Sequence, residues 1–140
     1  MPATSASAPG KVILFGEHAV VYGQPAIAVP VTQVSAKAII TPLIAASPGA
    51  IRIEAPAIGL DANLDDLSAD DPIAVALAGA FAALGVEQPP AFKLKISSTI
   101  PVAAGLGSGA AVSVAIIRAV AGFLGHPLAD DAVSQIAYDV

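Results

Sequence analysis

An uncharged stretch at residues 96–117 constrains the fold of this chain more than any other feature. Its 22 residues are long enough to span a lipid bilayer as one helix. A proline and three glycines interrupt it, at Pro101, Gly105, Gly107 and Gly109. Arg118 follows it directly. Because such residues break an apolar helix, we expect a strand, a glycine-rich turn and a buried helix of a folded domain, and no membrane span.

The charge balance narrows the classes of partner. The chain has 6 lysines and arginines against 11 aspartates and glutamates, so its net charge is −5. Binding to nucleic acid or to an anionic membrane surface needs clustered cations, so we expect neither as a partner. Hydrophobic residues make up 56% of the chain, which excludes intrinsic disorder. The chain has no cysteine and begins without a secretory signal, which suits a cytoplasmic location.

The remaining pattern predicts one α+β domain. Extended chain with a turn at Pro9 and Gly10 comes first. Strands are then expected at residues 12–15, 26–31, 34–40, 51–54 and 92–96. Helices are expected at residues 72–84, 108–125 and from about 130 onward. The segment 61–71 holds five aspartates and is predicted to be a solvated loop that ends in a helix N-cap.

The third expected helix has no ending signal. Apolar positions recur up to Val140 without a capping residue, a glycine or a proline. Natural domains tend to end at exposed, polar positions. We therefore expect residues 1–140 to be one incomplete unit of a longer protein.

The segment PVAAGLGSGAA, residues 101–111, lies between an expected strand and an expected buried helix. Glycines let backbone N–H groups approach a ligand closely, and the start of a helix favours an anion. The segment therefore suits a phosphate, although it has neither the Gly-Lys-Ser/Thr ending of the common P-loop nor the dinucleotide spacing. The alternative is a structural turn in which Ser108 is only the helix N-cap.

The segment APGKVILFGEHAVVYG, residues 8–23, places Lys11, Glu17 and His18 among glycines and apolar residues. Lys11 could stabilise charge on a transferred phosphoryl group, and Glu17 could accept a hydrogen bond from a substrate hydroxyl. The alternative is a surface ion pair between Lys11 and Glu17 beside a buried structural histidine. One histidine next to one glutamate does not make a metal site.

The two segments together resemble the GHMP kinase family. APGKVILFGEHAVVYGQPAIA is similar to the N-terminal motif of the members that phosphorylate mevalonate. PVAAGLGSGAA is similar to the phosphate-binding loop of the family, Pro-x-x-x-Gly-Leu-Gly-Ser-Ser-Ala-Ala. The similarity spans essentially the whole chain. It implies that residues 1–140 are the N-terminal, ATP-binding domain, with the fold of the second domain of ribosomal protein S5, and that they end before the C-terminal domain.

The resemblance also implies roles for individual residues. The γ-phosphoryl group of ATP would pass to the primary hydroxyl of mevalonate, with Mg²⁺ as the metal. Lys11 would be the catalytic residue beside the transferred group, and Glu17 and His18 would bind mevalonate. Residues of the loop would bind ATP, namely Pro101, Gly105, Leu106, Gly107, Ser108, Gly109 and Ala110. Mevalonate is then the small-molecule partner, and a homodimer is one assembly that the sequence leaves open.

Two departures from the family pattern affect this expectation. The second serine of the family loop, which binds Mg²⁺, corresponds here to Gly109, so Ser108, Ser113 or water would take its place. The other Mg²⁺ ligand and the catalytic Asp of the family would lie beyond residue 140, so we expect this chain alone to have little or no kinase activity. Two rivals stay open: another small-molecule GHMP kinase, such as a phosphomevalonate or sugar kinase, and a non-catalytic nucleotide-binding or dimerising module.

Overall fold

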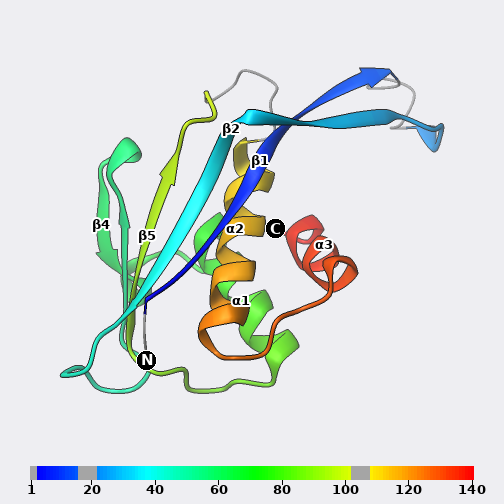
Figure 1. Ribbon diagram of the computed structural model, residues 1–140. Coiled ribbons are helices and arrows are strands. Elements are labelled where there is room, and N and C mark those ends of the chain that lie inside the picture. The colour runs from blue at the N-terminus through cyan, green and yellow to red at the C-terminus, as the bar shows by residue number, and fades with distance from the viewer. Residues whose placement is uncertain (1–2, 16–21, 102–107) are drawn as a thin grey trace.

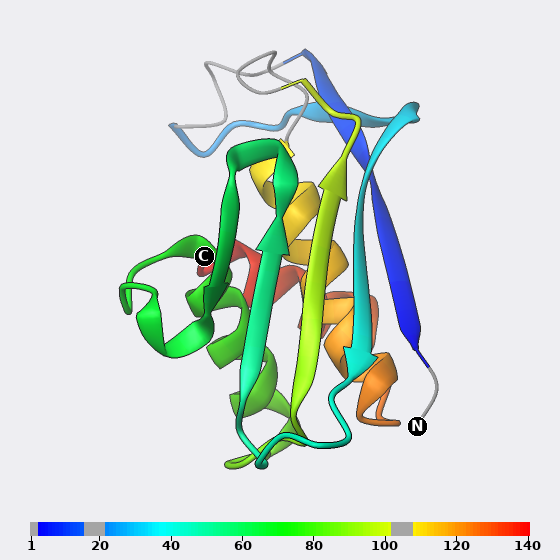
Figure 2. The same ribbon diagram turned by 90° about the vertical axis from the view of Figure 1, so that its left-hand side faces the viewer.

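Three α-helices cover one face of a five-stranded sheet in the computed structural model, which describes residues 3–15, 22–101 and 108–140 (Figures 1 and 2). The strands are β1 (Thr4–Phe15), β2 (Ile27–Pro42), β3 (Ile51–Ala55), β4 (Leu60–Asn63) and β5 (Phe92–Ser98). The helices are α1 (Pro72–Leu84), α2 (Ser108–Phe123) and α3 (Asp130–Tyr138). This arrangement confirms the predicted α+β fold.

The sheet has the strand order β1-β2-β5-β3-β4. β3 and β5 are parallel, and the other neighbouring pairs are antiparallel. α1 lies in the connection between the two parallel strands. Figure 2 shows the sheet in front of the three helices, with β1 and β4 at its edges.

Alternation along the strands sets the buried face of the sheet. In β2, Ala38 and Ile40 are fully buried, and they pair with the buried Ile96 and Leu94 of β5. Intervening residues such as Lys95 point to the other face and are exposed. Successive side chains of a strand face opposite sides of the sheet, so this pattern directs one apolar face toward the helices.

β2 corrects the prediction of two separate strands at residues 26–31 and 34–40. It is one strand, but its pairing with β1 shifts: Pro9 pairs with Ser35, whereas Gly10 pairs with Val31. Residues 32–34 of β2 therefore have no counterpart in β1. The turn predicted at Pro9 and Gly10 is this irregularity within a continuous β1, because proline cannot donate to the ladder and an offset there is tolerated.

The predicted acidic loop at residues 61–71 was wrong in its first part. Residues 60–63 form β4, which pairs with β3. Asp61 is therefore a strand residue, and its carboxylate makes an ion pair with Arg52 of β3 at 2.7 Å. The predicted N-cap is confirmed: the Asp71 carboxylate accepts a hydrogen bond from the Ile73 backbone N–H at 2.9 Å.

α2 is the centre of the core. It packs against β1 and β2 on one side and against α1 and α3 on the other. Its buried positions include Ala115, Ile116 and Val120. The predicted buried helix is thus confirmed, and no helix among the described residues is long and apolar enough to cross a membrane. Arg118 reaches the surface of α2, where it binds Asp130 at 3.1 Å.

Candidate nucleotide-binding site

The segment that leads into the glycine-rich loop is fixed to β2 by a threonine. The Thr99 hydroxyl accepts a hydrogen bond from the Ser35 N–H at 3.0 Å and donates to the Ser35 carbonyl at 3.3 Å. The Thr99 N–H donates to the same carbonyl at 2.9 Å. Next to it, the Ser98 hydroxyl accepts from the Ile100 N–H at 3.1 Å. These bonds set the direction of the chain just before Pro101, which is exposed.

Lys11 lies at the same end of the sheet. It is partly buried in β1 and pairs with Pro30 of β2, five residues along that strand from the Ser35 that holds Thr99. Two other residues expected to act with Lys11, Glu17 and His18, fall outside the described residues.

The start of α2 carries the described part of the predicted phosphate site. Ser108 is the first residue of the helix, and Gly109 and Ala110 are exposed in its first turn. A Cβ atom placed on Gly109 would meet no atom within 4 Å. The other loop residues of the prediction, Gly105, Leu106 and Gly107, fall outside the described residues. The described part of the predicted site is therefore the first turn of α2, where position 109 has room for a side chain.

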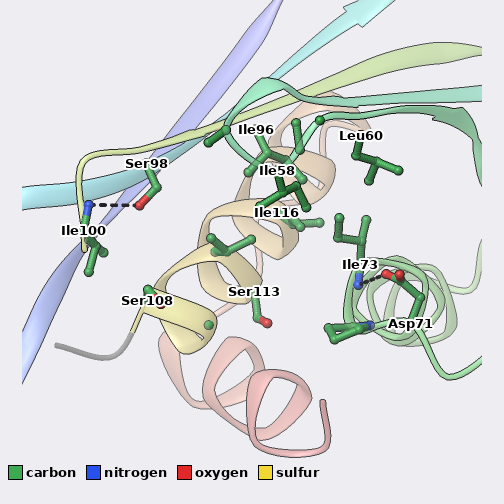
Figure 3. A pocket seen from close by; sticks show the side chains of 16 residues that line it. Ile58, Leu60, Asp71, Ile73, Ile96, Ser98, Ile100, Ser108, Ser113 and Ile116 are labelled. Carbon is green, nitrogen blue, oxygen red and sulfur yellow. Dashed lines mark hydrogen bonds between the residues drawn. The ribbon is translucent and has the colours of Figure 1, made fainter. Parts of the chain in front are cut away.

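A pocket of about 460 Å³ opens beside this helix start (Figure 3). Its walls come from the end of β5, the start of α1, α2 and the connection between β3 and β4. Six large apolar side chains line it: Ile58, Leu60, Ile73, Ile96, Ile100 and Ile116. Ser108 and Gly109 border the same pocket. A flat apolar group thus fits within reach of a group bound at the start of α2.

The polar side chains that line the pocket are few. They are Asp71, Ser98, Ser108 and Ser113. Asp71 and Ser98 already accept local backbone hydrogen bonds. The three described ion pairs involve residues that do not line the pocket, including Lys93 with Glu54 at 3.8 Å. The pocket is therefore an apolar space with a single carboxylate at the start of α1.

Comparisons with known proteins agree with this arrangement. Residues 72–140 match the family model of the GHMP kinases N terminal domain, a span that contains α1, β5, α2 and α3. A mevalonate kinase of Methanocaldococcus jannaschii is 34% identical over 140 residues, which cover 94% of this chain and 44% of that protein. A mevalonate kinase of Thermococcus sibiricus is 39% identical over 151 residues, covering 96% and 43%.

A solved structure gives the same result. The crystal structure of the Methanococcus jannaschii mevalonate kinase has a TM-score of 0.80 at 31% identity, covering 96% of this chain and 44% of that chain. The chain belongs to the GHMP kinase family. It spans less than half the length of the curated relatives it matches.

Sequence reasoning missed most of the pocket of this chain. It identified the glycine-rich segment and Ser108, but gave no role to Ile58, Leu60 or Ile73, which come from segments far from the loop in the sequence. No local sequence signal marks these residues, and only the structure shows that Ile58, in the short Pro-Ala-Ile-Gly turn, is 69% exposed and lines the pocket. An exposed large apolar side chain beside a glycine turn is a feature that a ligand can cover.

Proposed function

We propose that this chain is the N-terminal, nucleotide-binding part of a mevalonate kinase, which transfers the γ-phosphoryl group of ATP to the primary hydroxyl of mevalonate. The observation that carries the proposal is the apolar pocket beside the first turn of α2, directly after the glycine-rich segment. The names of the curated relatives support mevalonate as the substrate.

Electrostatics orient the nucleotide in this proposal. The N–H groups and the positive dipole end at the start of α2 favour phosphate, whereas the Asp71 carboxylate across the pocket repels it. The phosphates therefore lie against Ser108, Gly109 and Ala110. The base then enters the pocket between Ile96 and the start of α1, where burial of its faces is favourable. Pro101, Gly105, Leu106 and Gly107 complete the phosphate site.

The donor groups of the described residues fit Mg²⁺ in part. Ser108 supplies a hydroxyl near the phosphate position, whereas Gly109 supplies no side-chain oxygen. Among the described residues, no group of three or more histidines or carboxylates could hold a metal ion. Mg²⁺ usually retains several waters and binds through few protein oxygens, so Ser108 would hold it together with water and phosphate oxygens. When bound, the ion neutralises the phosphate charge.

The remaining roles concern the reacting groups. Lys11 stabilises the charge of the transferred phosphoryl group, and Glu17 and His18 bind mevalonate so that its hydroxyl faces that group. Catalysis of phosphoryl transfer is mainly positioning and charge neutralisation, so few side chains are needed. The position of Lys11 at the sheet end where β5 leaves for the loop supports its role.

The test is ADP formation by the complete product of the reading frame that encodes this chain. We expect ATP turnover with mevalonate to exceed the rate without it, and to exceed the rates with phosphomevalonate and with galactose. Turnover with one of those two instead would identify another small-molecule GHMP kinase. ATP binding with no turnover on any of the three would favour a non-catalytic module.

A further inference from the structure

Ser113 stands out within the described ranges because it is the one residue with a polar side chain that is buried, with 5% of its surface exposed. It lies on α2 and lines the apolar pocket together with Ile73 and Ile116. Figure 3 shows its hydroxyl on the side of α2 that faces the start of α1. Alanine is common on this helix, so a hydroxyl at a buried position needs a physical reason.

The hydroxyl of Ser113 is open to the pocket. The side-chain hydrogen bonds between described residues all involve other groups. Yet no side-chain oxygen or nitrogen of these residues is both sealed from solvent and without a partner. This hydroxyl is therefore not a sealed, unsatisfied group, and because Ser113 lines the pocket a ligand atom there can bond to it. A ligand that fills the pocket removes water from this hydroxyl, so a ligand that also offers it a hydrogen bond gains affinity over one that does not.

The position along α2 indicates which part of the ligand this is. Ser113 comes five residues after Ser108, which corresponds to about 7.5 Å along the helix axis. Phosphate bound at the start of α2 is too far away for a direct bond to the Ser113 hydroxyl. The same distance argues against Ser113 as the replacement Mg²⁺ ligand that the sequence alone left open. The group that reaches Ser113 is the one that occupies the apolar pocket.

We propose that the Ser113 hydroxyl binds the polar edge of the nucleobase and is a specificity-determining residue of this chain. The proposal rests on the proposed function, in which the base occupies the pocket. A hydroxyl both donates and accepts, so it can bond to a ring nitrogen or to an exocyclic amine of the base. The isoleucine walls supply burial for the faces of the ring, and Ser113 supplies the bond that fixes its edge.

The experiment compares two ligands of the 140-residue chain by isothermal titration calorimetry: ATP with Mg²⁺, and inorganic tripolyphosphate with Mg²⁺. We expect Ser113→Ala to weaken ATP binding about 3- to 10-fold, the effect of one neutral hydrogen bond, and to leave tripolyphosphate binding unchanged. Ser97→Ala removes an exposed hydroxyl of β5 outside the pocket and should change neither affinity. Ser113→Cys keeps the volume with a weaker hydrogen bond and serves if the alanine variant fails to fold.

Each outcome has a distinct meaning. Unchanged ATP binding by Ser113→Ala overturns the role of Ser113, while ATP binding by the unsubstituted chain still supports the proposed function. Equal weakening of both ligands also overturns it, because Ser113 would then act at the phosphate end. If the unsubstituted chain binds ATP no more tightly than tripolyphosphate, the base does not use the pocket and the role of Ser113 is overturned. If it binds neither ligand, the proposed nucleotide site fails as well.

Discussion

Gly79 occupies the middle of α1, where alanine would be the better helix former by about 1 kcal/mol. Its neighbours in α1 are mostly alanines, so the glycine is an exception that the helix itself does not explain. The reason is α3: a Cβ atom at position 79 would lie 2.6 Å from Cγ2 of Ile136. Real Cβ contacts of that length essentially do not occur, so Gly79→Ala must displace α3 or the Ile136 side chain.

The expected cost follows from two opposing effects. Inserting a methyl group into a packed contact costs about 1–3 kcal/mol, and alanine regains about 1 kcal/mol of helix propensity. Ile136 cannot easily move Cγ2 away, because a β-branched side chain in a helix has one strongly preferred χ1 rotamer. We therefore expect Gly79→Ala to lower the free energy of unfolding by about 1 kcal/mol, within a range of roughly 0–2 kcal/mol.

The assay is urea unfolding of the chain followed by far-ultraviolet circular dichroism. Gly109→Ala is the matched control, because a Cβ atom there meets nothing within 4 Å, and it should not destabilise the chain. In an Ile136→Ala background the Cγ2 atom is gone, so Gly79→Ala should become stabilising by about 1 kcal/mol. If Gly79→Ala stabilises the original chain as much as it does that background, the close approach of α1 and α3 is not what keeps glycine at this position.

Three further predictions concern the site. Asp71→Ala removes the N-cap of α1 and should lower the free energy of unfolding by about 1 kcal/mol in the same urea assay, whereas Asp70→Ala, which leaves that cap intact, should lower it less. Gly109→Ser fits without a clash and adds a hydroxyl beside Ser108. Calorimetry should show that this variant binds ATP more tightly than the original chain when Mg²⁺ is present, and equally tightly when it is absent. If the variant and the original chain bind ATP equally well in the presence of Mg²⁺ too, that result argues against a metal near position 109. Lys11→Met should lower kcat of the complete protein on the order of 100-fold with a small change in the ATP KM, as measured by ADP formation, and an unchanged kcat would remove Lys11 from the catalytic residues.

The sequence predicted the elements whose residues alternate or are capped. Strands β3 and β5 and helix α1 were found, because their burial patterns and the Asp71-Pro72 start are local signals. β4 was missed because none of its four residues is β-branched or aromatic, and what makes it a strand is its pairing with β3. The division of β2 was predicted from two separate runs of β-branched residues, at 26–31 and 34–40, whereas its continuity depends on β1, which pairs with it on both sides of the offset.

The candidate site was predicted unevenly for a similar reason. The glycine-rich segment is continuous in the sequence, so its relation to the start of α2 could be anticipated. The pocket is assembled from four segments, and ordinary isoleucines such as Ile58 and Ile73 carry no local sign of their position. The roles of Lys11, Glu17 and His18, the homodimer and the cytoplasmic location stay predictions.

The parallel pairing of β3 and β5 has a consequence for how such a site can change. Parallel strands bring their carboxyl ends to one edge of the sheet, and the pocket lies at that edge, between the residues that follow β3 and those that follow β5. In the proposed binding mode the chain after β5 leads to the phosphate side, whereas Ala57, Ile58 and Gly59 of the turn after β3 line the space proposed for the base. Substitutions in that turn can therefore alter which base is accepted while the phosphate anchor stays intact. The two binding functions that we propose for this pocket are thus encoded far apart in the gene and can evolve separately.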